Sequence, residues 1–364
     1  MFKGTGFGKQ VEVAGEVVFN TGMVGYPESL TDPSYSGEIL LQTYPLIGNY
    51  GVPPYSTVDS FGVPIHFESD RVQVTGYAVA ELQEEPSHWS NSKALGTWLA
   101  EQGIPGIEGI DTRDLTKRLR TKGTMLGVLI AGDGVEPDEA REKARHIEDP
   151  NSRDLVKGVT VPKSFEYKGA SQATVVVIDC GMKYGILRAL LARGVSVVRV
   201  PYDSSPEEVM GFNPAGILVS NGPGDPKKCA KTIQTVRALL EGKVPIMGIC
   251  LGNQIIALAA GADTYKLTFG HRGQNQPCTE LRTGRCYITS QNHGYAVDVQ
   301  RMQPGWKSWF ENLNDGTNEG VQCIERPHFS VQFHPEGRPG PEDTEFLFDD
   351  FLAIAGQMRA GGVR

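Results

Sequence analysis

The sequence contains no long apolar run and no long basic run, and each absence excludes a class of function. No stretch approaches the roughly 18 consecutive apolar residues of a membrane-spanning helix, so we expect no membrane partner. Aspartate and glutamate (43) outnumber lysine and arginine (35), which gives a formal net charge of -8. Because a chain without a basic patch has few groups to neutralise phosphates, we expect no nucleic-acid partner.

Cysteine is scarce and lacks the spacing of metal sites. Six cysteines occur in 364 residues and none forms a CxxC pair, so we predict no metal in this chain. A chain of this length does not need disulfides, and we expect free thiols in a reducing compartment. The first four residues resemble neither a signal peptide nor a transit peptide, so we predict a cytoplasmic location.

The sequence has the length and the apolar content for two domains. Hydrophobic residues make up 39% of the chain, which is ordinary for globular proteins. Residues 1–150 are rich in glycine and proline, and we predict a smaller, mixed α/β domain there. The periodicity weakens over 151–172, which we predict as a linker, and becomes regular over 173–358, the second domain.

Local signals place a few elements in the first domain. A strand is predicted over 14–20, followed by a loop over 21–37, where glycine, proline, serine and aspartate are dense. Helices are predicted over 92–102 and 112–122, and Asp111 is a natural N-cap for the second of them.

The second domain alternates short β-branched runs with helical segments. Strands are predicted over 173–178, 196–201, 215–220 and 244–249, with helices between them. Alternation of this kind predicts a doubly wound, mostly parallel sheet. Because ligands of such sheets bind beyond the carboxyl ends of the strands, we expect the functional site at those ends.

One of these strand ends carries a cysteine between two glycines. Gly248-Ile249-Cys250-Leu251-Gly252 matches the sharp strand-to-helix turn that presents a nucleophile above an α/β sheet. The glycines leave room for a tight turn, and the helix N-terminus favours a negatively charged sulfur. The alternative interpretation is a small buried thiol at a strand end.

His334-Pro335-Glu336 follows another short strand, predicted over 329–333. A thiol nucleophile needs a base, and the base needs a group that orients it. Side chains two residues apart in an extended chain point to the same side, so His334 can take the thiol proton while Glu336 holds the imidazole. The alternative is a surface histidine and glutamate in a strand-ending turn.

Two polar loops also follow predicted strands. The loop 220–226 contains Gly222 and Gly224, whose backbone N–H groups can form an oxyanion hole together with that of Leu251. The loop 291–295 offers amide and ring groups to a small polar ligand. Ordinary turns are the alternative for each loop alone. Together with the cysteine and the histidine, they indicate one nucleophilic site at one edge of the sheet.

These residues resemble the class I, or triad-type, glutamine amidotransferases, through 248–254 (Gly-Ile-Cys-Leu-Gly-Asn-Gln) and 334–336 (His-Pro-Glu). Nearly the whole chain resembles the small, glutaminase component of carbamoyl phosphate synthetases, whose first domain other amidotransferases of this class lack. The segments that carry the closer resemblance are 15–22, 25–28, 30–35, 44–49, 111–113, 220–226, 291–295 and 316–320.

The resemblance implies a role for each matching residue. Cys250 attacks the side-chain amide of L-glutamine, His334 transfers the proton and Glu336 orients His334. Gly224 and Leu251 donate backbone N–H groups to the oxyanion. The residues implied to hold the glutamine are Ser34, Gly222, Gln254, Asn292, Gly294 and Tyr295. A γ-glutamyl thioester forms, and water hydrolyses it to glutamate.

In the family the ammonia passes to a large ATP-using synthetase, which makes carbamoyl phosphate for pyrimidine or arginine synthesis. The resemblance therefore implies no cofactor in this chain, with ATP, bicarbonate and magnesium expected only on the synthetase partner. That partner is either a separate large subunit or a fused ATP-grasp domain.

Two features depart from the family pattern. The family usually has histidine in place of Asn253, and a strand with an Asp-Gly turn usually precedes the segment 2–8. These features keep open a second hypothesis, a regulatory or structural partner that uses little glutamine itself. A γ-glutamyl peptidase on the same sheet is a third. For the leading hypothesis, we predict weak glutaminase activity without the synthetase, because docking should order the site.

Overall fold

The computed structural model describes residues 1–132 and 136–361, and the chain divides into two compact units. The first unit is Met1–Leu155 together with the short segment Thr268–Arg272, and the second is Val156–Leu267 with Gly273–Arg364. The stretch 151–172, predicted as a linker, is therefore divided between the units, and 156–172 belongs to the second. It supplies a buried valine to the core and an edge strand to the sheet, because its few apolar residues pack there.

In the first unit, six strands of the described chain form one sheet in the order β1-β7-β5-β3-β2-β8. The four central strands are parallel, and the edge strands β1 and β8 are antiparallel to their neighbours. The strands are β1 Thr5–Gly8, β2 Glu12–Asn20, β3 Glu38–Gln42, β5 Gly76–Ala78, β7 Pro105–Glu108 and β8 Met125–Ile130. A separate parallel pair is formed by β4 Leu46–Ile47 and β6 Glu81–Leu82.

The predicted helices of this unit are present. They are α2 (Leu95–Glu101) and α3 (Thr112–Lys122), and α4 (Pro137–Arg145) follows β8. The side chain of Asp111 caps α3 as predicted, because it accepts a hydrogen bond from the backbone N–H of Asp114. Apolar side chains of α2 and α3 enter two separate core clusters of this unit.

The predicted loop 21–37 was wrong in part, because it contains the short helix α1 (Tyr26–Leu30). Gly25, at φ 80°, starts the helix in a conformation that favours glycine. The hydroxyl of Tyr50 accepts hydrogen bonds from the backbone N–H groups of Gly25 (2.8 Å) and Tyr26 (3.0 Å). Glycine and proline indicated a loop, whereas a tyrosine distant in sequence satisfies the helix N-terminus.

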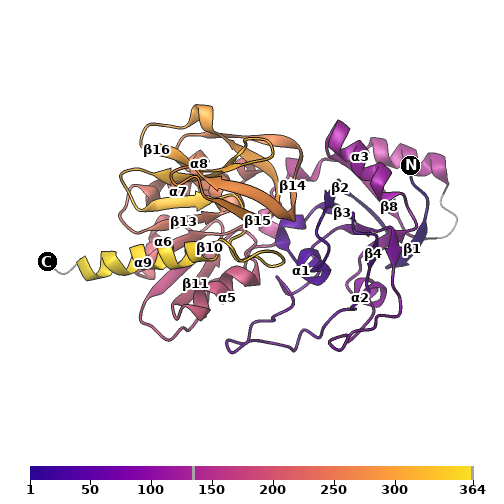
Figure 1. Cartoon of the computed structure of the whole chain (residues 1–364), viewed down its shortest axis with the longest axis horizontal. Helices are drawn as coiled ribbons and strands as arrows, with labels where there is room; N and C mark the ends of the chain where they lie inside the picture. The colour runs from indigo at the N-terminus through magenta and orange to yellow at the C-terminus, as the bar shows by residue number, and fades with distance from the viewer. Residues whose placement is uncertain (133–135, 362–364) are drawn as a thin grey trace. The chain divides into compact units, whose positions relative to one another are not determined.

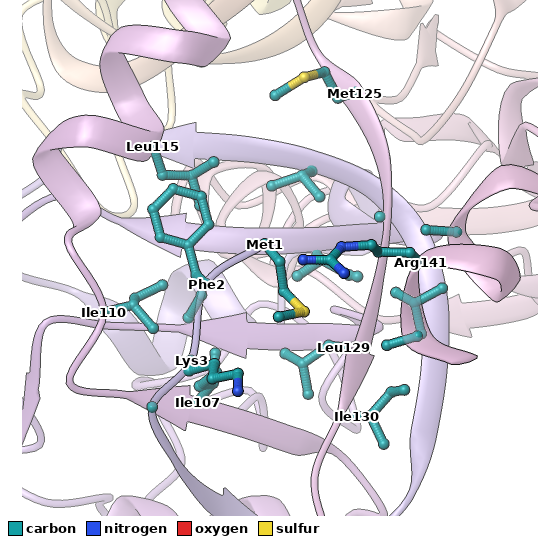
Figure 2. Close-up of a pocket in the computed structure, with 18 of the residues that line it drawn as sticks. Met1, Phe2, Lys3, Ile107, Ile110, Leu115, Met125, Leu129, Ile130 and Arg141 are labelled. Carbon is teal, nitrogen blue, oxygen red and sulfur yellow. The ribbon is translucent and has the colours of Figure 1, made fainter. Parts of the chain in front are cut away.

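An apolar pocket of about 570 Å³ lies in the first unit (Figure 2). Its walls include Met1 and Phe2 of the N-terminal segment, Leu115 of α3 and Leu129 of β8. Lys3 and Arg141 supply its charge, and no described lining residue is a cysteine, histidine, aspartate or glutamate. The pocket therefore contains none of the nucleophilic or basic groups predicted for catalysis.

In the second unit, ten strands of the described residues form a sheet in the order β15-β14-β16-β17-β18-β13-β12-β10-β11-β9. The predicted parallel sheet is confirmed for β11, β10, β12, β13 and β18, while the outer pairs that involve β9, β14, β16 and β17 are antiparallel. The bounds are β9 Phe165–Tyr167, β10 Thr174–Asp179, β11 Ser196–Pro201, β12 Gly216–Val219, β13 Ile246–Ile249, β14 Asp263–Glu280, β15 Cys286–Asp298, β16 Trp306–Asn312, β17 Asn318–Cys323 and β18 His328–Val331.

Helices alternate with the parallel strands, as the periodicity predicted. They are α5 Tyr184–Ala192, α6 Pro206–Gly211, α7 Ala230–Leu240 and α8 Leu251–Ala259, and α9 Phe346–Gly361 ends the described chain (Figure 1). The core between helices and sheet consists of fully buried aliphatic side chains such as Val176, Ile217 and Ile255. No helix in the described part of the chain has the length and apolar character to cross a membrane.

Candidate active site

Cys250 stands in a strained turn between β13 and α8. Its backbone has φ 56° and ψ -105°, a conformation that residues other than glycine rarely adopt. The backbone N–H of Cys250 donates to the carbonyl of Val331 on the neighbouring strand β18 at 2.8 Å. Tertiary contacts therefore hold the cysteine in the geometry of a nucleophile at the top of an α/β sheet.

The two glycines of the turn are required by close backbone contacts. A Cβ on Gly248 would lie 2.6 Å from the side chain of Ile256, and a Cβ on Gly252 would lie 2.1 Å from the carbonyl oxygen of Val219. Because α8 presses against β12 at this point, any larger residue must displace the helix that starts behind Cys250.

We expect Gly252→Ala to lower the free energy of unfolding by about 2 to 3 kcal/mol, because the added methyl group overlaps a backbone carbonyl. Gly356→Ala in α9 is the matched control, since a Cβ there meets nothing within 4 Å and alanine favours helix. Urea unfolding of both variants measures the effect. Equal stability of the two variants would contradict the proposed packing of the turn.

His334 and Glu336 lie beside the cysteine at the carboxyl end of β18. Strands β13 and β18 are parallel neighbours with Ile249 opposite Val331, so the segments that follow them meet at one sheet edge. His334 Nδ1 is 2.7 Å from Glu336 Oε1, and both side chains are almost completely buried. The carboxylate therefore fixes the orientation of the ring, as the spacing in the sequence predicted.

Lys183 is a third charged member of this buried cluster, and the sequence did not identify it. Its Nζ lies 2.9 Å from Glu336 Oε1, with 3% of the lysine side chain and none of the glutamate side chain exposed. The residue follows the end of β10, in the same kind of strand-end loop as the other site residues. That position was the only signal in the sequence.

The protonation of His334 and Glu336 follows from this arrangement. Burial opposes ionisation of Glu336, but the charges of Lys183 and His334 outweigh it and hold the pKa of this carboxyl well below its usual range. Burial and the charge of Lys183 oppose charge on His334, but the carboxylate of Glu336 and the neighbouring Cys250 raise the pKa of His334 to about 10. The cluster therefore favours an imidazolium beside an ionised glutamate.

The other ring nitrogen of His334, Nε2, is not held by Glu336 and is therefore the one that can act on Cys250. Nε2 is buried, while Nδ1 is held by Glu336. Cys250 influences the pKa of the ring electrostatically, so the sulfur lies close to it. The backbone N–H of His334 donates to the carbonyl of Ser290 at 2.9 Å, which fixes this segment against β15.

The glycine loop after β12 lies against the residue that follows the cysteine. A Cβ on Gly222 would stand 2.0 Å from the carbonyl oxygen of Cys180 and 2.8 Å from the side chain of Leu251. Gly224 has φ 82°, which favours glycine. The loop and the start of α8 are thus adjacent, as an oxyanion hole built from both would require.

Four of the residues implied to hold glutamine surround the same turn. Gln254 Nε2 donates to the carbonyl oxygen of Tyr295 at 2.9 Å, and Cys250 Sγ lies 3.5 Å from the carbonyl oxygen of Asn292. Gly294 lies between them in β15. Ser34 belongs to the first unit, where it is buried and its N–H donates to Asp32 Oδ1. Its role toward glutamine stays a prediction.

Comparison with known proteins assigns a family to both parts of the chain. Residues 1–129 match the carbamoyl-phosphate synthase small chain, CPSase domain, and residues 176–354 match the glutamine amidotransferase class-I family. The carbamoyl phosphate synthase small chain of Methanopyrus kandleri is 49% identical over 353 residues, which cover 96% of this chain and 94% of that protein. The chain belongs to the carbamoyl phosphate synthase small-chain family.

Other small-chain relatives differ in length. The carbamoyl phosphate synthase arginine-specific small chain of Neosartorya fischeri is 47% identical over 99% of this chain and 79% of its own length. Multifunctional protein pyr-3 of Neurospora crassa is 48% identical over 96% of this chain, but the chain spans only 20% of that protein. Sequences similar to this chain thus occur both in proteins of about its own length and within much longer proteins.

Proposed function

We propose that this chain hydrolyses L-glutamine to glutamate and ammonia and supplies the ammonia to a carbamoyl phosphate synthetase. The observation that supports this best is the buried Cys250, His334 and Glu336 cluster at one edge of a parallel sheet. A thiol activated by an oriented imidazole is suited to acyl transfer from an amide.

The proposed reaction has two steps on one sulfur. The thiolate of Cys250 attacks the side-chain amide carbon of glutamine. The amide oxygen becomes an oxyanion, which accepts hydrogen bonds from the backbone N–H groups of Gly224 and Leu251. His334 gives its Nε2 proton to the departing nitrogen, so ammonia leaves and a γ-glutamyl thioester remains. Water then attacks the thioester and loses one proton to His334, so the C–S bond breaks and the thiolate and the imidazolium are regenerated. Glutamate is released, and the second proton passes to solvent as its new carboxyl group ionises. Glu336 holds the ring throughout.

The rest of the proposal concerns the substrate site and the partner. We assign glutamine binding to Ser34, Gly222, Gln254, Asn292, Gly294 and Tyr295. ATP, bicarbonate and magnesium are assigned to the synthetase, a separate subunit or a fused ATP-grasp domain, with no cofactor in this chain. Carbamoyl phosphate would then serve pyrimidine synthesis, arginine synthesis or both, in the cytoplasm.

We expect slow glutamate release by the chain alone and about tenfold faster release once a synthetase large subunit is added, because docking and catalysis are coupled. Glutamine labelled with ¹⁵N in its side-chain amide should give ¹⁵N carbamoyl phosphate when ATP and bicarbonate are present. A chain that supports synthesis from free ammonia but not from glutamine would be a structural partner instead. Glutamate release from γ-glutamyl peptides, with none from glutamine, would indicate a peptidase.

A further inference from the structure

A buried network of uncharged polar side chains lies behind the nucleophile turn. Ser330 Oγ donates to Asn253 Oδ1 at 2.8 Å, and Asn253 Nδ2 donates to Gln332 Oε1 at 3.0 Å. Gln332 Oε1 also accepts from Gln254 Nε2 at 3.1 Å. All four side chains belong to residues that are no more than 2% exposed. The network connects the first turn of α8 to β18 and to the segment that leads to His334.

The direction of each hydrogen bond in this network follows from a backbone carbonyl at one end. The carbonyl oxygen of Tyr295 can only accept, so Gln254 must turn its Nε2 toward it. The same Nε2 faces Gln332, which must therefore present its oxygen. Asn253 must then present its Nδ2 to that oxygen. Reversing any one amide would place two donors or two acceptors face to face.

This orientation leaves one polar atom without a partner. Gln332 Nε2 is buried and forms no hydrogen bond within the described residues. A buried donor without an acceptor is unfavourable, and such atoms are uncommon in folded proteins. The two hydrogen bonds that Gln332 Oε1 accepts offset the unfavourable burial of its Nε2. The orientation of the Gln332 amide is thus imposed by its neighbours rather than by its own best pairing.

The network determines what Gln254 can offer to a ligand. Both hydrogens of its amide nitrogen are used, one by Tyr295 and one by Gln332, so only Oε1 remains for hydrogen bonding. We infer that Asn253 and Gln332 are positioning residues that fix the Gln254 amide with its oxygen toward the substrate, where it accepts a hydrogen bond from glutamine. The inference rests on the proposed function, in which Gln254 binds glutamine.

Two variants that add the same charge to this network separate the inference from a general effect of charge. Asn253→Asp replaces the donor toward Gln332 by an acceptor. The Gln332 amide must then reverse, and Gln254 must turn its Nε2 away from the carbonyl oxygen of Tyr295. Gln332→Glu keeps an acceptor toward both Asn253 and Gln254. We expect N253D to raise the KM for glutamine at least about tenfold, as loss of a buried hydrogen bond would, and Q332E to change it less than about threefold.

The pH dependence provides a second readout that a structural defect would not give. A protonated aspartic acid can still donate to Gln332, so the KM defect of N253D should grow as pH rises and this side chain ionises. Asn253→His is the conservative variant, because an imidazole N–H can donate to the same oxygen and should keep the KM near that of the wild type. It also serves if N253D does not fold, with Asn253→Ala as the variant that lacks the donor.

Glutamine binding is measured independently of hydrolysis, by the protection that glutamine gives Cys250 against iodoacetamide. Equal KM and equal protection in N253D, N253H and the wild type would overturn the inference, and so would an equal rise of KM in N253D and Q332E. A wild-type chain that binds glutamine without hydrolysing it would overturn the proposed function, while the binding comparison still tests the network. A wild-type chain that does not bind glutamine would overturn both.

Discussion

Replacing Cys250 by alanine is expected to abolish glutamine hydrolysis, with a fall in kcat of roughly four orders of magnitude, because the acyl group then has no nucleophile to join. The fold should persist, since the strained backbone of this turn is held by the hydrogen bond to Val331 rather than by the sulfur. Glutamate release in the presence of a synthetase measures the loss. Thermal unfolding of the same samples shows whether the variant is folded.

Alkylation of Cys250 can be measured specifically only when the other accessible thiols are replaced. All six cysteines are free, and Cys286 is exposed and Cys323 partly exposed, so both compete for alkylating reagents. A chain with Cys286→Ser and Cys323→Ser should keep its activity and should still be inactivated by iodoacetamide at a single site. Substantial glutamine-dependent synthesis by Cys250→Ala in this background would remove Cys250 from the mechanism.

The second large effect is expected from the buried pair of Lys183 and Glu336. Their side chains are 3% and 0% exposed and 2.9 Å apart, so removing either partner breaks an ion pair in the interior, although Glu336 keeps His334 at 2.7 Å when Lys183 is removed. We expect Glu336→Gln to lower the free energy of unfolding by about 3 to 5 kcal/mol and Lys183→Met to lower it by less, because Glu336 keeps His334 as a partner. The double variant should lose less than the sum of the two, because it removes both members of the ion pair together. Urea unfolding of all four proteins measures the coupling.

The pH profile of stability checks the same cluster through His334. The pKa of His334 is raised from 6.5 to about 10 in the folded protein. Its contribution to the free energy of unfolding is therefore complete below pH 6.5 and is lost as the pH rises toward 10. Glu336 has a lowered pKa and contributes above 4.5, with a loss as the pH falls below that value. In E336Q the loss of stability at acid pH that Glu336 causes should disappear, and the decline of stability at alkaline pH should become shallower. Parallel profiles of the wild type and E336Q would contradict this assignment.

The chemistry of the candidate site could be predicted from the sequence because its signals are local. The glycine-flanked cysteine and the pair His334 and Glu336 each lie within five consecutive residues, and both follow β-branched or aromatic strands. Alternation of strands and helices predicted that such strand ends meet at one edge. The parallel registers of β12, β13 and β18 confirm the sheet that this argument needs.

Other features of the site depend on pairs of residues that are far apart in the chain. Lys183 and Glu336 are separated by more than 150 positions, and nothing in the spacing of either residue indicates the other. The same holds for Gln332, whose amide joins Asn253 and Gln254. In the first unit, α1 begins where the hydroxyl of Tyr50 accepts hydrogen bonds from two backbone N–H groups, although the sequence of α1 is typical of a loop.

The sequence by itself thus determined the class of sheet and predicted the candidate nucleophile, base and orienting carboxylate, because tight turns and strand periodicity impose local residue patterns. Only the tertiary structure decided which buried cation balances Glu336, and how a chain of amides orients Gln254. Burial is the physical reason, since an interior charge or amide requires a partner of matching chemistry, and that partner is supplied by whichever strand end packs beside it.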